Sequence, residues 1–164
     1  MYCPVCDSQD TTQSFDKITL SNVGLDNVYL DNVPVISCND CDHISHIIPK
    51  QKLILRQLTT ALCTLKRSLK GAEFAFLRNE LNYTGIKLAM LLGTTNVTIS
   101  RWEKGEFDIH PLADRSLRAL VLRHLNTSIA LDLVMENISV GEQSVICIDV
   151  STFSDGDEVA LKIA

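Results

Sequence analysis

The sequence of 164 residues predicts a mixed α+β fold, with a small N-terminal four-cysteine lobe, an all-α lobe and a C-terminal pair of strands. Three patterns favour this fold. Two CxxC motifs enclose short β-branched segments, leucines recur at helical spacing through the middle of the chain, and two apolar runs near the end flank an Asp-Gly turn signal. We therefore divide the chain into a cysteine lobe, a linking helix, an all-α domain and a C-terminal helix with a hairpin: 1–48, 49–69, 70–125 and 126–164.

The two CxxC motifs predict a metal site. Cys3 and Cys6 form the first motif, Cys38 and Cys41 form the second, and 31 residues separate the two motifs. Four thiolates at this spacing are typical of a closed, tetrahedral structural zinc site, so we expect one Zn²⁺ ion. Disulfide bonds are the alternative in an oxidising compartment, and a rubredoxin-like iron site is another, although the glycines that usually follow its knuckles are missing.

Nothing in the sequence predicts an enzyme. The nucleobase deaminases combine a P-C-x-x-C run with an H-x-E motif, and no H-x-E occurs in this sequence. Neither a nucleophile-and-base constellation nor a phosphate-binding Gly-rich loop is found. His43 and His46 follow the second motif and are either surface residues or replacements for a cysteine ligand. Cys63 and Cys147 stand alone and are expected to be small buried apolar residues.

Two strands are expected between the motifs, over Asp16–Leu20 and Val28–Ile36, which are rich in β-branched residues. Proline cannot donate to a β ladder, so Val33-Pro34 predicts that the second strand lies at a sheet edge. A lobe of this size would not be stable without its metal.

An apolar stripe after Pro49 predicts the linking helix, and Gly71–Leu81 is expected to be the first helix of the all-α domain. Pro111 begins another helix. Its core residues are expected to be Leu112, Leu117, Leu120, Val121 and Leu125. Its arginines either contact phosphates or are simply solvated: Arg115, Arg118 and Arg123.

Two helices joined by a tight turn are predicted between residues 84 and 105. Thr84–Leu92 has the apolar spacing of the first helix, and Gly93 supplies a left-handed turn. Thr95 can cap the second helix at the N–H of Thr98, and Gly105 ends it. This order of residues is typical of a helix-turn-helix, whose second helix enters the DNA major groove; an ordinary helix pair is the alternative.

From Lys70 to Leu125 the sequence resembles the Xre type of helix-turn-helix, the fold of the phage repressors. The resemblance implies that base edges are reached by Asn96, Val97 and Arg101. Their chemistry suits adenine, a thymine methyl and guanine, respectively. The DNA-binding set also includes Thr95, Thr98 and the expected phosphate contact Lys104. The resemblance further implies an architectural pair between Arg78 and Glu103.

Over residues 1–125, the order of lobes and the run G-L-D-N-V-Y-L at Gly24–Leu30 resemble the MqsA-type (YgiT-type zinc finger) antitoxins. That resemblance implies a zinc lobe that binds a toxin and a helix-turn-helix lobe that dimerises and represses the shared operon. Val97 stands where that family has Asn, so the operator sequence does not transfer. The tail after Asn126 is also additional to the family pattern.

Charge is unevenly distributed along the chain. Residues 1–48 carry one Lys and seven Asp (−6), residues 49–125 carry thirteen cations and six acids (+7), and residues 126–164 carry one Lys and seven acids (−6), giving −5 overall. A basic middle between acidic ends favours a DNA-binding module whose flanking segments avoid DNA.

The tail is expected to continue as helix over Asn126–Ile138 and then to form a hairpin from 145–150 and 159–163, with disorder as the alternative. A lone hairpin is unstable, so it must pack on the lobe, pair across a dimer or await a partner. No apolar run reaches the length of a membrane span, and the first residues do not form a signal peptide, so we expect a cytoplasmic protein.

Two functions agree with these patterns. The first is a sequence-specific repressor that binds a palindromic operator in double-stranded DNA as a homodimer and also neutralises a small toxin protein. The second is a free-standing regulator of a phage or mobile element with a purely structural zinc lobe. The sequence leaves open the toxin, the operator and the role of the tail.

Overall fold

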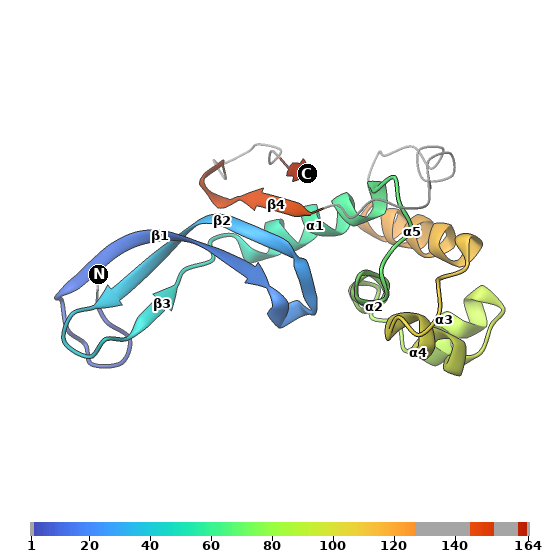
Figure 1. The fold of residues 1–164 in the computed structure, drawn as a ribbon, viewed down its shortest axis with the longest axis horizontal. Helices are drawn as coiled ribbons and strands as arrows, with labels where there is room; N and C mark the ends of the chain where they lie inside the picture. Colours follow the sequence, from blue (N-terminus) through green and yellow to red (C-terminus); the bar gives the residue numbers. More distant parts are fainter. Residues whose placement is uncertain (1, 127–144, 153–160, 164) are drawn as a thin grey trace. The chain divides into compact units, whose positions relative to one another are not determined.

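The computed structural model describes residues 2–126, 145–152 and 161–163. The chain forms two compact units. The first combines Met1–Asn22, Asp26–Ile54 and Ser144–Ala164, and the second contains Val23–Leu25 and Leu55–Gln143. The fold is mixed α+β, as the sequence predicts (Figure 1).

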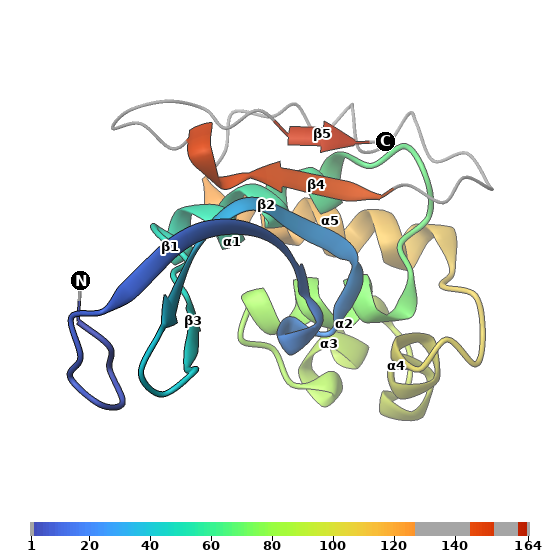
Figure 2. The same cartoon turned by 60° about the vertical axis from the view of Figure 1, so that its left-hand side comes forward.

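The first unit is organised around a five-stranded sheet in which β1, β2, β4 and β5 follow one another and β3 pairs with β2 (Figure 2). The strands are β1 (Thr11–Leu20), β2 (Leu25–Cys38), β3 (Ile44–His46), β4 (Ile146–Asp149) and β5 (Leu161–Ile163). Short 3₁₀ helices follow β1 and β4, at Ser21–Val23 and Val150–Thr152. Both strands expected between the CxxC motifs are present, and each is longer than the sequence predicts.

The C-terminal strands belong to this sheet and do not form a separate extension. β4 runs parallel to β2, with Val28 opposite Ile146 and Leu30 opposite Ile148, and all four side chains are fully buried. β5 pairs antiparallel with β4, so the expected pairing of the two C-terminal strands is confirmed. The apolar side chains of β2 thus gain a neighbouring strand from the far end of the sequence.

Pro34 does not mark an edge strand, because β2 lies inside the sheet. On β2, Val28–Asp31 pairs with β4 and Val35–Ser37 pairs with β3. Pro34 lies between these two paired stretches, where its missing N–H breaks no ladder bond to β3 or β4. Its carbonyl still accepts a hydrogen bond from Ile47 N at 2.8 Å.

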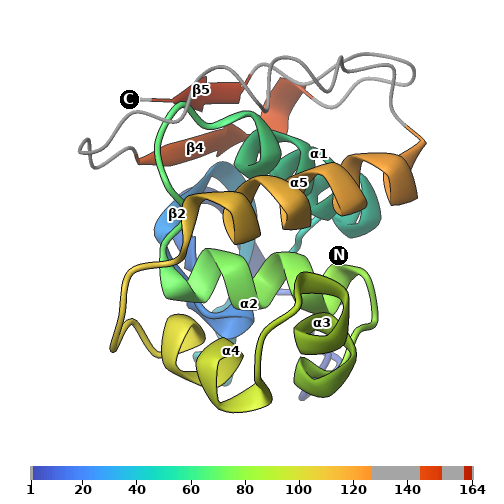
Figure 3. The ribbon, with the colours of Figure 1, turned by 90° about the vertical axis from the view of Figure 1, so that its right-hand side faces the viewer.

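The helices are α1 (Gln51–Thr64), α2 (Gly71–Glu80), α3 (Gly85–Leu92), α4 (Asn96–Glu103) and α5 (Pro111–Leu125). In the second unit α2 packs against α4 and α5, and α3 packs against α4 (Figure 3). Phe74 and Trp102 meet edge to face with ring centroids 5.9 Å apart, which anchors α4 on α2. The core of this helical unit also includes Leu77, Leu88, Ile99, Leu117 and Val121.

The linking helix ends at Thr64, earlier than the sequence predicts, because buried charges hold the next residues in a non-helical path. Arg118 is 1% exposed and donates to the carbonyls of Leu65 and Arg67, each at 2.6 Å. Its partner Asp114 accepts from Leu69 N at 2.8 Å. Arg118 therefore stabilises the α1–α2 connection, and the expectation that it is solvated or contacts phosphate is wrong.

A second buried ion pair supports the same connection. Arg67 donates to both carboxylate oxygens of Glu73, at 2.8 and 2.6 Å, and the Lys70 N–H donates to the same carboxylate at 2.8 Å. Glu73 is fully buried, so its charge requires these partners. Together the two ion pairs fix the start of α2.

Asn126 ends α5. It takes a left-handed backbone with φ of 52°, and its N–H caps the helix on the carbonyls of Leu122 and Arg123. The expectation that helix continues from Asn126 is therefore wrong at that residue, and the remainder of that prediction, to Ile138, lies outside the described residues. Within the part of the chain that the structure describes, none of the helices has the length and apolar content needed to cross a bilayer.

Candidate functional site

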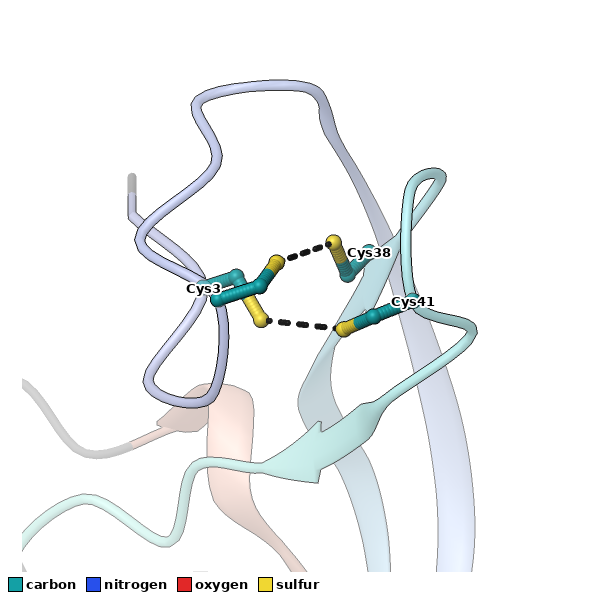
Figure 4. Close-up of side chains that lie close together, drawn as sticks. Cys3, Cys38 and Cys41 are labelled. Carbon is teal, nitrogen blue, oxygen red and sulfur yellow. Dashed lines mark hydrogen bonds between the residues drawn. The ribbon is translucent and has the colours of Figure 1, made fainter.

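The four cysteines of the CxxC motifs come together at one end of the sheet. Cys3 and Cys6 lie in the turn before β1, Cys38 ends β2, and Cys41 lies in the turn before β3. The sulfurs of Cys3 and Cys41 are 3.6 Å apart, those of Cys6 and Cys38 are 3.5 Å apart, and all four lie within 4.8 Å of one another (Figure 4). This cluster could hold a metal ion.

Backbone hydrogen bonds close each cysteine turn. Cys3 N donates to Ser8 O at 2.9 Å, and Cys38 N donates to His43 O at the same distance. Asp7 and Asp42 directly follow the second cysteine of each motif and take left-handed backbones, with φ of 58° and 55°. Aspartate tolerates this conformation better than most residues, so it can occupy the position after each cysteine turn where rubredoxin-like sites usually have glycine.

Neighbouring sulfurs of the cluster influence the pKa of Cys3 and that of Cys6. The N–H groups of Val5 and Cys6 donate to the Cys3 sulfur and lower its pKa to about 6. The Ser8 N–H also acts to lower the pKa of Cys6, but the neighbouring Cys41 sulfur and burial outweigh it and raise that pKa to about 12. Without a cation, the cluster therefore stabilises one thiolate while opposing another. A divalent ion supplies the charge that several adjacent thiolates require.

Side chains next to the cysteines connect the two turns. Asn39 donates through its amide to Asp10 Oδ1 at 2.7 Å and through its backbone N–H to Asp10 O at 3.0 Å. Ser8 also donates to the Asp40 carboxylate. The candidate ligand group contains no histidine among the described residues, and His46 instead lies 3.8 Å from Asp16.

The second candidate site is formed by α3, the turn after it and α4. Thr84 caps α3 by accepting from Lys87 N at 3.2 Å, and Thr95 caps α4 by accepting from Thr98 N at 3.1 Å. Gly93 takes the left-handed turn with φ of 65°. The Thr95 cap and the Gly93 turn lie where the sequence predicts them. The first helix begins at Gly85, one residue later than expected, and Thr84 caps it.

One face of α4 is exposed and the other is buried. Ile99 and Trp102 face the core, whereas the exposed residues of α4 and its end are Asn96, Val97, Arg101 and Lys104. Thr95 is also exposed and Thr98 is half-buried, with their hydroxyls 2.9 Å apart. Val97, Arg101 and Lys104 follow one another at helical spacing, so they share one face of the helix.

Two glycines allow α4 to approach its neighbours closely. A Cβ on Gly85 would collide with the Asn96 amide oxygen, which lies over the first turn of α3. A Cβ on Gly71 would collide with the Trp102 carbonyl and lie 2.6 Å from the Glu103 carbonyl. These contacts could not be predicted from the sequence, because glycine at a helix start usually reflects capping preference.

Arg78 of α2 and Glu103 of α4 form an ion pair. Arg78 Nε lies 2.5 Å from Glu103 Oε1, and Nη2 donates to Oε2 at 3.2 Å. The remaining Arg78 nitrogen donates to Tyr83 O at 2.7 Å. Both side chains are mostly buried, at 16% and 20% exposed, so the pair holds the end of α4 against α2 and the connection to α3.

An apolar surface lies beside α4. A cavity of about 460 Å³ is lined by Leu91, Trp102, His110 and Leu112, among others. Leu91 and Leu112 are 54% and 65% exposed, and nearby Met90 is 77% exposed. The expectation that Leu112 belongs to the core is therefore wrong: it lies in the first turn of α5, at the cavity.

Comparison with models of known protein families and with curated proteins finds no match to this chain.

Proposed function

We propose that the protein is a sequence-specific DNA-binding transcriptional repressor and that α3 and α4 form a helix-turn-helix. The observation that carries this proposal is the geometry of α4. Its buried face is anchored by Trp102 and the Arg78–Glu103 pair, while its opposite face presents amide, apolar and cationic side chains to solvent. A short, firmly supported helix with such a face suits insertion into a major groove.

Each exposed side chain of α4 has a role in this proposal. Arg101 pairs with O6 and N7 of a guanine, Val97 contacts a thymine methyl and Asn96 reads adenine. Lys104 contacts a phosphate, while Thr95 and Thr98 lie at the helix N-terminus, where backbone N–H groups attract phosphate oxygens. Because Asn96 rests on Gly85 in the free protein, its amide must turn outward to reach a base.

A homodimer completes the proposed DNA-binding unit, because a palindromic site is read by two related helices. The apolar surface of Met90, Leu91 and Leu112 lies next to the proposed reading helix and is suited to a second copy of the chain. Leu112→Asp should shift sedimentation of the full chain from dimer to monomer. Phe15→Asp is the matched control, because Phe15 is equally exposed, at 65%, on β1 in the other unit. A monomeric wild-type chain would contradict the dimer.

The metal in this proposal is a single structural Zn²⁺ ion bound by Cys3, Cys6, Cys38 and Cys41. Four cysteine sulfurs are the donor set of closed structural zinc sites, and they leave no position for substrate. When bound, the ion would hold the two cysteine turns together and supply the positive charge that the clustered thiolates need.

The partner of the repressor is proposed from the resemblance to the MqsA-type antitoxins and from charge. Residues 1–48 and 126–164 each carry −6, which suits a basic protein such as a small ribonuclease toxin. In the alternative, a free-standing regulator, the same acids only keep these segments away from DNA. Co-expression of the full chain with the product of the neighbouring gene distinguishes the two. An antitoxin should co-purify with that product and be required for growth in its presence, whereas a free-standing regulator should be dispensable.

Selection of duplexes from a random pool tests the DNA-binding function itself. The full, metal-loaded chain should enrich a palindrome whose half-sites are separated by about one helical turn or a multiple of it. A pool that stays random after repeated selection would contradict the function.

A further inference from the structure

The segment that follows α4 folds back beside Arg101. Gly105 takes a left-handed backbone with φ of 71°, and Glu106 N donates to the Arg101 carbonyl at 2.9 Å. This closes the end of α4 with a hydrogen-bonded turn. The turn returns the chain toward the helix, so the side chains of Glu106 and Phe107 lie near the Arg101 guanidinium.

Both side chains contact that guanidinium. Arg101 Cζ lies 5.5 Å from the centroid of the Phe107 ring, and Arg101 Nε lies 3.9 Å from Glu106 Oε2. Phe107 is 58% exposed, so burial in the core does not account for its position. A cation over an aromatic face at this distance is attracted to the ring, and the carboxylate adds a weak, exchangeable ion pair.

We propose that Glu106 and Phe107 form a cradle that orients Arg101 before DNA binds, and that Glu106 increases the preference for specific over non-specific DNA. This inference rests on the proposed DNA-binding function. It assigns Phe107 and Glu106 as positioning residues for Arg101, which makes the proposed base contact.

The role of Phe107 follows from the flexibility of arginine. A free arginine side chain loses rotamer entropy when it is fixed in one orientation. A ring that already limits the guanidinium to one region reduces the part of this loss that occurs on binding. Bidentate pairing with guanine depends on the guanidinium plane, so it benefits most from this orientation, while a diffuse phosphate contact benefits little.

The role of Glu106 follows from its charge. A carboxylate beside the reading face repels phosphates of every sequence and partly neutralises Arg101 in non-specific complexes. On the preferred sequence, guanine acceptors replace the carboxylate at the guanidinium. Because the Arg101–Glu106 contact is long and both side chains are about half exposed, at 53% and 51%, that exchange costs little.

The cradle can be tested first in the free protein. The Arg101 Nε–H resonance of the full, metal-loaded chain, assigned by its loss in Arg101→Lys, should carry a ring-current shift. Phe107→Tyr keeps the aromatic face and should keep the shift, while Phe107→Leu keeps apolar bulk and should lose it. An Arg101 resonance that is the same in all three chains would overturn the cradle.

Binding measurements then test its effect on recognition. Affinities are measured for a duplex selected by the wild-type chain and for a scrambled duplex of the same composition. Phe107→Leu should weaken binding to the selected duplex by about 2- to 5-fold, with little change on the scrambled one. Phe107→Tyr should bind both as the wild type does. If Phe107→Leu weakens both duplexes equally, or neither, the positioning role is overturned.

Glu106→Gln should tighten binding to the scrambled duplex and make the salt dependence of that binding steeper by up to about one released ion. The ratio of the affinity for the selected duplex to that for the scrambled duplex should therefore fall. Asp108→Asn removes the same charge from the next exposed acid in the segment and should change the ratio less. Equal effects of these two variants would overturn the role of Glu106. A wild-type chain that prefers no duplex would overturn the DNA-binding function and the cradle's role in it. If the chain does prefer a duplex but its Arg101 Nε–H resonance has no ring-current shift, the cradle alone is overturned.

Discussion

The guanidinium of Arg78 donates to both carboxylate oxygens of Glu103, joining the last turn of α2 to the last residue of α4. The same guanidinium donates to Tyr83 O before α3 begins. One side chain thus fixes both the end of α4 and the approach to α3. The position of the exposed face of α4 depends on this contact.

Removing one partner of this pair should destabilise the helical unit. Arg78→Ala leaves Glu103 largely buried without its cation, and we expect a loss of about 1–3 kcal/mol in the free energy of unfolding, measured with urea. The double variant Arg78→Ala/Glu103→Ala should lose less than the sum of the single variants, because neither charge remains uncompensated. Strictly additive losses would show that the two residues do not interact.

The tail should contribute to the stability of the first unit. Ile148→Ala leaves a cavity next to β2, and we expect a cost of about 2–4 kcal/mol, together with faster hydrogen exchange at the Leu30 amide. Val145→Ala is the matched control: Val145 is 39% exposed and precedes β4, so it should change stability by less than about 0.5 kcal/mol. Similar costs for both variants would argue against the parallel pairing of β4 with β2.

Metal analysis of the purified chain should find one zinc ion, and Cys38→Ser should lower that content sharply by removing one of four thiolates. The same variant should increase protease cleavage within residues 1–48 and leave the helical unit folded. Cys147→Ser is the control, because Cys147 lies outside the cluster and should leave the zinc content unchanged. Finding the four cysteines oxidised and free of metal in protein made under reducing conditions would contradict the proposed site.

Cys63 should resist alkylation in the folded protein. Burial raises its pKa to about 12, despite the opposing influence of the Arg118 charge. At pH 8 the thiolate fraction is therefore about one in ten thousand, and the reagent also lacks access. Mass spectrometry after iodoacetamide treatment should show modification of Cys63 only as the chain unfolds, well after the half-exposed Cys147. Equal rates for the two in native protein would show that Cys63 is accessible.

Local chemistry explains what the sequence predicts well. Gly93 and Thr95 act through their own backbone and the next few residues, so their turn and cap can be read directly from sequence. The spacing within each CxxC motif likewise places two sulfurs on one turn. The convergence of both turns on one cluster is also as expected, because each CxxC turn supplies only two of the four ligands of a tetrahedral site.

Long-range relationships explain the rest. Ile146 and Ile148 are recognisable as strand residues, but their pairing with Val28 and Leu30, more than 100 positions away, depends on which edge of β2 is left open. Arg118 is predicted as a surface cation because arginine is rarely buried. Its partners are mostly backbone carbonyls, which carry no side-chain signal. The i,i+4 spacing of Asp114 and Arg118 is the one local sign of that ion pair.

The cradle at Arg101 is intermediate between these cases. Glu106 and Phe107 follow Gly105 directly, so a left-handed glycine could have indicated that the chain turns back toward α4. That Glu106 and Phe107 contact Arg101 depends on the geometry of this turn, which composition does not predict.

The proposed reading of a base by Arg101 is tested by measuring the binding of Arg101→Ala and Lys104→Ala to a selected and a scrambled duplex. Arg101→Ala should cost about 1–3 kcal/mol on the selected duplex, remove the preference at one base pair and change scrambled binding little. Lys104→Ala should weaken both duplexes similarly and make the salt dependence shallower by about one ion. Loss of the same factor on both duplexes for Arg101→Ala would contradict base reading.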